Sequence, residues 1–280
     1  MSAVLDKKTV SGWVGEIDIC FAKRPDKTVM QSVKHVGPLR VQRPFYPEQD
    51  VCHVYLLHPP GGVVGGDSLN IKIKTESNSH ALITTPGSTK YYRSAGEFAQ
   101  VKQNLSVQDD ACLEWFPQEN IFFPGSKVKI RTEIHLSNNA GFMGWEISCL
   151  GRPASDEIFD TGNLDSGLLI YRDKKVIFNE RQRIFRLKHL SSAAGLRNHP
   201  MSAVFVATGC DESAVDQARE IVSLLKPGFP VGITLLGDLL VLRALGESAE
   251  KLQKIMIPVW QMLRFKIVNK KAITPRIWLT

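Results

Sequence analysis

The sequence predicts a mostly β protein with a small α+β lobe at its C-terminal end. Over the first two thirds, apolar and polar residues alternate with a period of two, most clearly at 69–74 and 128–136. This pattern is typical of strands with one apolar face. Over the last third, apolar residues recur at helical spacing. Many short strands favour a sandwich, barrel or solenoid, and a solenoid would be irregular because no fixed repeat occurs.

Turn residues such as Pro86-Gly87 and Asn138-Asn139 separate further strand candidates in the first two thirds. These candidates are residues 51–57, 80–85, 101–107, 145–150, 168–172 and 184–187.

The C-terminal third predicts the order strand, helix, strand, strand, helix. Asp211 and Ser248 stand where helix N-caps are expected, and Gly237-Asp238 predicts a tight turn between two strands. Pro258 lies inside the second helix and is expected to kink or shorten it. No Ser/Gly/Pro-rich linker occurs, so we expect residues 1–280 to form one unit. Its β-rich body covers about 1–200 and its lobe about 201–280.

Composition narrows the class of protein. The chain has 280 residues, and none of its apolar runs reaches the roughly 18 residues that a membrane span needs. Its five cysteines are odd in number and make no CxxC pair, so we expect free thiols in a reducing cytoplasm. The net charge of +7 equals the seven Lys and Arg residues from 251 onward, where no acid occurs. We interpret this segment as a solvated helix face and tail; nucleic acid or an acidic protein partner is the alternative.

A glycine-rich segment contains Gly61, Gly62, Gly65 and Gly66. A dinucleotide or phosphate loop needs a following helix, and a P-loop needs Gly-Lys-Ser/Thr; strand-like residues follow here instead. The segment is therefore interpreted as a tight turn between strands.

His58 and Asp67 flank these glycines, and a strand–turn–strand can bring them together as nickel or zinc ligands. The alternative is that Asp67 closes an Asx turn and His58 ends a strand.

Three glutamates, Glu114, Glu146 and Glu180, lie in strand-like segments. Neighbours in a strand point to opposite faces, so Glu114 and Glu146 point away from the adjacent tryptophan. The simple interpretation is a solvent face. If that face enclosed a channel, the carboxylates would attract a divalent cation.

Evidence for hydrolase chemistry is weak. No Gly-x-Ser-x-Gly nucleophile elbow occurs. Ser88 and Lys90 allow a Ser–Lys dyad, but a turn followed by a strand explains them better. No cofactor motif is present.

Several motifs in fixed order give the chain its clearest resemblance. They are HVGPL at 35–39, VQRPFYPE at 41–48, LHPPGGVVGGD at 57–67, TTPGSTKYYRS at 84–94, LEWFPQE at 113–119, LGRPA at 150–154 and PRIWLT at 275–280. Together they resemble the UreD family of urease accessory proteins over nearly the whole chain. Phe116 stands where the family usually has Leu, and Ser155-Asp156 where a Gly is expected.

The resemblance implies an irregular β-helical body with a helical lobe. It also implies a non-enzymatic cytoplasmic scaffold that docks on the urease apoprotein, recruits UreF and the GTPase UreG, and helps nickel enter urease through an internal passage. No tightly bound cofactor, nucleic acid or membrane is implied, only transient Ni(II). The alternative is a pure protein-interaction scaffold without nickel handling.

Two sets of residues are predicted to serve this role. The predicted nickel route contains Asp67, His58, Glu146 and Glu180. The predicted motif and partner-binding residues are Gly61, Gly62, Gly65, Gly66, Arg93, Glu114 and Arg152.

Overall fold

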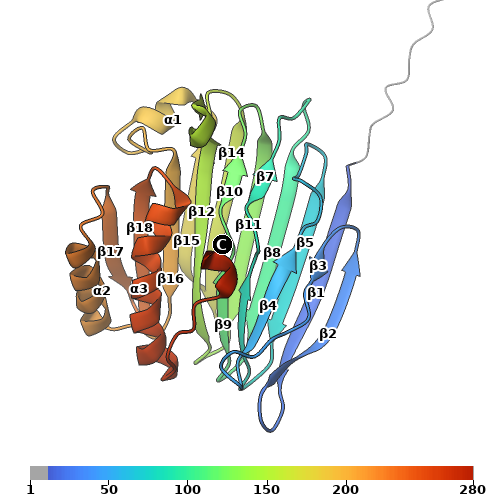
Figure 1. Cartoon of the computed structure of the whole chain (residues 1–280), viewed down its shortest axis with the longest axis vertical. Helices are drawn as coiled ribbons and strands as arrows, with labels where there is room; N and C mark the ends of the chain where they lie inside the picture. The colour runs from blue at the N-terminus through green and yellow to red at the C-terminus, as the bar shows by residue number, and fades with distance from the viewer. Residues whose placement is uncertain (1–11, 280) are drawn as a thin grey trace, which may run out of the picture.

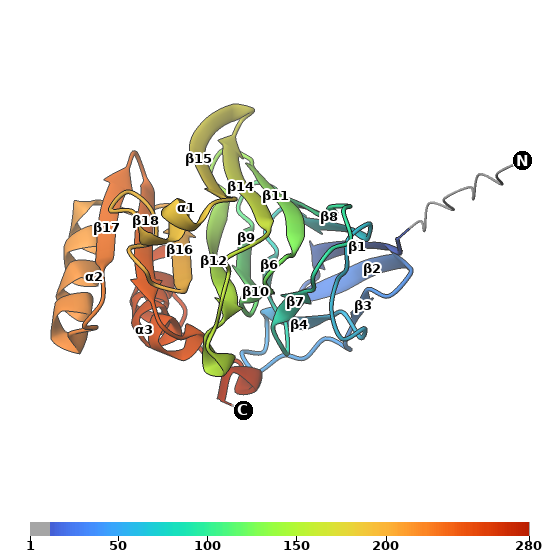
Figure 2. The same cartoon turned by 90° about the horizontal axis from the view of Figure 1, so that it is seen from above.

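The computed structural model describes residues 12–279, which form two large β-sheets with helices at the C-terminal end (Figures 1 and 2). Within these residues the first sheet has seven strands, in the order β15 (Lys175–Ile184), β14 (Asn163–Arg172), β11 (Lys127–Leu136), β8 (Ala99–Val107), β5 (Ser68–Thr75), β1 (Val14–Lys23) and β2 (Thr28–Val36).

The second sheet of the described chain has eleven strands. Its main path is β17 (Val231–Leu236), β18 (Leu239–Gly246), β16 (Met201–Ala207), β12 (Gly141–Arg152), β9 (Cys112–Phe116), β6 (His80–Thr84), β4 (Cys52–Leu57) and β3 (Arg40–Val41). Three short strands join off this path: β7 (Thr89–Tyr91), β10 (Asn120–Phe122) and β13 (Glu157–Ile158).

The chain passes repeatedly from one sheet to the other, which produces stacked coils. Strands β1, β5, β8, β11 and β14 are parallel neighbours in the first sheet. Strands β4, β6, β9 and β12 are parallel neighbours in the second. This solenoid-like arrangement confirms the predicted irregular β-helical body. The two sheets cover each other's inner faces, whereas the outer face of the smaller sheet is exposed at positions such as Lys72 and Lys74 of β5.

Period-two alternation places the main core between the sheets. On β5, for example, Leu69, Ile71 and Ile73 are buried, whereas Lys72 and Lys74 are exposed. Each buried aliphatic side chain stabilises the fold by about 1.5–3 kcal/mol relative to exposure.

A second core lies between the outer face of the larger sheet and two helices, α2 (Glu212–Leu225) and α3 (Ala249–Val268). Strand β16 pairs antiparallel with β12, so this sheet runs without a break from the body into the lobe. The predicted caps are confirmed: Asp211 accepts a hydrogen bond from the Ala214 N–H at 2.8 Å, and Ser248 from the Lys251 N–H at 3.2 Å.

One prediction about local structure was wrong, and so was one half of another, the expectation that Pro258 kinks or shortens its helix. Residues 184–187 do not form a strand, because β15 ends at Ile184 and a short helix, α1 (Leu187–Ser191), follows. Helix α3 continues past Pro258 to Val268, so the proline does not shorten it.

Single-turn 3-10 helices occupy Pro153–Ser155 and Arg276–Leu279. None of the described helices is long and apolar enough to cross a membrane. All five cysteines are free, and four of them are buried.

Candidate functional site

Two cavities that open to the surface lie against the β body, and Glu146 lines both. The first, of about 330 Å³, is lined by the turn after β4, including His58 and Gly62, and by inner residues such as Gln103. The second, of about 890 Å³, lies between β15 and strands β16–β18 and is lined by residues including Arg243. Of the described residues, only Glu146 lines both cavities. Its carboxyl therefore stands where the two spaces meet.

Strand alternation gives Glu146 this position. Trp145 packs in the outer core under the helices, so Glu146 points inward between the sheets. The sequence predicted that the two residues lie on opposite faces, but its simple interpretation of the Glu146 side as a solvent face was wrong. The Thr132 hydroxyl donates a hydrogen bond to Glu146 Oε1 at 2.5 Å. Burial raises the pKa of Glu146 to about 7, the Thr132 contact opposes that rise, and the charge of Glu180 adds to it. The side chain keeps some accessible surface because it faces the cavities.

A row of inward-facing residues crosses the smaller sheet at the level of Glu146. Thr132 on β11 is in register with Gln103 on β8 and with Leu168 on β14. Leu168 is in turn in register with Glu180 on β15. Gln103 and Thr132 thus form a polar pair beside Glu146, and the buried Leu168 separates them from Glu180 in this row.

Unpartnered polar atoms mark the wall of the first cavity. Within residues 12–279, Gln103 Oε1 and Trp115 Nε1 are buried without a protein hydrogen-bond partner. Both residues line the cavity that Glu146 closes. Buried polar atoms of this kind normally bind ordered water or an ion, so the cavity is suited to polar contents.

Glu180 lies at the wall of the second cavity, on the same face of β15 as the buried Phe178. Its carboxylate binds the Arg243 guanidinium, with a distance of 2.7 Å between Oε2 and Nη2. Because Arg243 comes from β18, this partly exposed ion pair connects the two sheets where they diverge.

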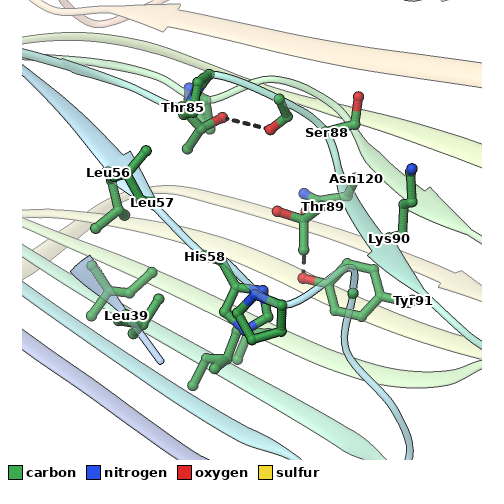
Figure 3. Close-up of a pocket in the computed structure, with 18 of the residues that line it drawn as sticks. Leu39, Leu56, Leu57, His58, Thr85, Ser88, Thr89, Lys90, Tyr91 and Asn120 are labelled. Atoms are coloured by element: carbon green, nitrogen blue, oxygen red, sulfur yellow. Dashed lines mark hydrogen bonds between the residues drawn. The ribbon is translucent and has the colours of Figure 1, made fainter. Parts of the chain in front are cut away.

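His58 and Asp67 take different positions. His58 lines the first cavity, where Figure 3 shows it between Leu39 and Tyr91. Burial lowers the pKa of His58, and the nearby charge of Asp67 partly offsets this. The two oxygens of Asp67 accept hydrogen bonds from the backbone N–H groups of Trp13, at 2.8 Å, and Val64, at 2.9 Å. These contacts favour the turn-closing interpretation of Asp67.

The glycines allow close packing of the turn between β4 and β5. A Cβ at Gly62 would lie 2.4 Å from the Tyr92 ring, and Gly66 has a φ of +96°, which favours glycine. A Cβ at Gly65 would likewise collide with the Ser94 side chain. The Gly61 carbonyl accepts a hydrogen bond from the Tyr92 hydroxyl at 2.9 Å. Gly61 and Gly62 also line the first cavity.

Arg93 and Arg152 lie on the surface. The Arg152 Nε donates to Glu157 Oε2 at 2.8 Å, and its guanidinium lies 4.9 Å from the centre of the Phe123 ring. Arg93 is exposed and packs over Gly125. Neither residue lines a described cavity.

Glu114, predicted as a partner-binding residue, has no exposed side-chain surface in this chain. Its carboxylate accepts from His80 Nε2 and Trp260 Nε1, both at 2.6 Å, and from Arg264 Nε at 2.9 Å. Burial alone would raise the pKa of Glu114, but His80 and Arg264 lower it to about 2. Arg264 also binds Glu48 at 2.7 Å. Glu114 is thus part of a buried ion network under α3, because the helix covers the face that the sequence left open.

The Ser88 hydroxyl, considered above for a Ser–Lys dyad, donates to Glu119 Oε1 at 2.7 Å. No group of three or more His, Cys, Asp or Glu side chains suited to hold a metal ion occurs among residues 12–279.

Sequence analysis missed Gln103 and Thr132. Each is polar at an inward position of a strand whose other inward residues are apolar, such as Val101 beside Gln103 and Ile130 beside Thr132. A break of this kind in a period-two pattern was the available signal.

Comparison with known proteins supports the family resemblance over nearly the whole chain. The family model described as UreD urease accessory protein matches residues 14–279. The urease accessory protein UreD of Alcanivorax borkumensis is 55% identical over 265 residues, which cover 95% of this chain and 90% of the relative. The protein of the same name from Citrobacter koseri is 42% identical over 280 residues, covering 100% of this chain and 96% of the relative. The chain belongs to the UreD family of urease accessory proteins.

Proposed function

We propose that this chain acts in urease maturation as a docked scaffold whose interior conducts nickel towards the urease apoprotein. The family supports the role in maturation. The observation that supports the conduit is the position of Glu146, which lines both cavities. UreF, UreG and the urease apoprotein are the proposed partners, and the chain itself turns over no substrate.

The chemistry of the wall fits a cation that must keep moving. Glu146, Thr132 and Gln103 offer oxygen atoms, which hold nickel less tightly than thiolates or several imidazoles would. Since the pKa of Glu146 is about 7, its proton and the ion compete for the same carboxyl near neutral pH. A site of this strength can bind an ion and release it, as conduction requires.

The test is to express the urease operon in nickel-containing medium with this chain deleted, with wild type, or with Glu146→Gln. Deletion should abolish urea hydrolysis. Glu146→Gln should assemble with its partners but lower urease nickel content roughly tenfold or more, the scale on which even outer-shell partners of metal ligands act. Glu133→Gln is the matched control, because Glu133 is partly exposed on the outer face of β11.

Three readouts separate the possibilities: co-purification of the complex, nickel per urease, and activity. If Glu146→Gln assembles and activates urease like wild type, the chain is a scaffold without a conduit at this residue. If it fails to assemble, Glu146 is structural. Normal activity without the chain contradicts the role in maturation itself.

A further inference from the structure

The mouth of the second cavity is unusually basic. Residues 181–210 contain five Lys and Arg residues and no Asp or Glu. Arg181, Arg183 and Arg197 line the cavity, and the exposed Arg186 and Lys188 lie between them in sequence. We call residues 181–199 the basic rim.

Part of this charge has no acidic partner within the described chain. Arg181 and Arg183 share Asp165, at 2.9 and 3.7 Å. In contrast, none of the ion pairs among residues 12–279 includes Arg186, Lys188 or Arg197.

The C-terminal basic segment is different, although it carries the net charge of the sequence. On α3, Lys251 binds Glu247 and Lys254 binds Glu250, each at 2.6 Å. Lys270 binds Asp50 at 2.8 Å. Five of the seven cations in this segment have an acidic partner. In the rim, three of five have none among the ion pairs of the described residues.

The shape beside the rim suits a polypeptide segment. The cavity lies between β15 and β17, which are the end strands of the two sheets in the described chain. Edge strands present unpaired backbone groups to a partner. Phe185 and Leu187 in the rim are 45% and 52% exposed, and Phe185 contacts the ring of the cavity-lining His189, with centroids 4.5 Å apart.

We propose that the basic rim is the docking site of an acidic protein segment that also carries apolar side chains. The proposal rests on the proposed function in one respect: a cation at this mouth would be repelled by unneutralised arginines, and carboxylates from a partner would remove that barrier. Nucleic acid fits less well, since the carboxyls of Glu146 and Glu180 face the same cavity and oppose a phosphate backbone.

The probe is a short fluorescein-labelled peptide of alternating Glu and Leu, mixed with the full-length protein. The rim variant is Arg186→Gln with Lys188→Gln. The control is Lys251→Gln with Lys254→Gln, which removes the same charge from α3. The rim variant should slow peptide association roughly tenfold, whereas the control should match wild type within about twofold. Added salt should weaken wild-type binding.

The peptide should also fail to bind once the protein is assembled with its proposed partners, because the rim is then covered. Equal binding by both double variants, salt-independent binding, or undiminished binding in the assembly would each overturn the proposal. So would tighter binding of a single-stranded oligonucleotide with the same dependence on the rim. Peptide binding needs no nickel, so the two proposals can fail separately. If the peptide does not bind but Glu146→Gln still lowers urease nickel, the docking site is rejected and the conduit is not.

Discussion

Two glutamates on neighbouring strands of one sheet, Glu114 fully buried and Glu146 partly buried, differ in almost everything except residue type. Glu114 on β9 faces the outer core, where α3 covers it, and Glu146 on β12 faces the interior between the sheets. Glu114 has Arg264, His80 and Trp260 as partners, whereas Glu146 has the Thr132 hydroxyl and open cavity.

Their pKa values move in opposite directions for this reason. The partners of Glu114 lower its pKa to about 2, while burial raises that of Glu146 to about 7. Charged partners offset the cost of burying a carboxylate, and a buried carboxylate without them is costly unless it protonates or meets a cation. The comparison shows that what packs over each face of the sheet decides the role of a glutamate there. Under α3, Glu114 holds the helix in place; beside the cavities, Glu146 is a candidate ion site.

The largest expected effect is at the anchor. Arg264→Ala removes the cation that the buried Glu114 and Glu48 share, which leaves Glu114 with His80 as its one remaining ion-pair partner in the described chain, and should lower the free energy of unfolding by about 3–5 kcal/mol. Lys266→Ala on the same helix removes a partly exposed contact with Asp211 and should cost at most about 1 kcal/mol. Denaturant unfolding measures both. If both variants lose the same unfolding free energy, the ion network does not anchor α3.

A smaller effect is expected at Glu146. Here the ionised side chain destabilises the folded state, so removing its charge should help stability at high pH. Folding raises the pKa of Glu146 above its unfolded value, so the folded state loses stability as pH rises from about 4.5 through about 7. Glu146→Gln does not titrate. Relative to this variant, wild type should lose up to about 3 kcal/mol between pH 5 and pH 8.

Unfolding free energies of wild type, Glu146→Gln and the control Glu133→Gln at both pH values test this. If the difference in unfolding free energy between wild type and Glu146→Gln does not change with pH, folding does not raise the pKa of Glu146.

Asp67 should give the smallest effect. Asp67→Ala leaves the N–H groups of Trp13 and Val64 without their acceptor, which costs about 1–3 kcal/mol. Asp67→Asn keeps one acceptor oxygen and should cost less. Once assembled, both variants should load urease with nickel as wild type does. A nickel defect in an assembled, stable Asp67→Asn protein would return Asp67 to the conduit.

Sequence reasoning predicted what depends on near neighbours. Period-two alternation predicted many strands, though not β1, β2 or most of β15, and it placed Glu146 opposite Trp145. The caps at Asp211 and Ser248 were predicted from local spacing. It could not predict which strands stack in register, because parallel partners such as Thr132 and Gln103 are far apart in the chain. The burial of Glu114 was equally out of reach, since it depends on Arg264, 150 residues away.

The conduit is tested most directly by the rate of nickel incorporation into urease in the purified assembly, measured from pH 6 to pH 8. Glu146 ionises near pH 7, so the ratio of the wild-type rate to the Glu146→Gln rate should rise as pH increases through this range. The ratio of wild type to Glu133→Gln should stay constant. Equal rates for wild type and Glu146→Gln, or a ratio that does not change with pH, would contradict a nickel route past the Glu146 carboxylate.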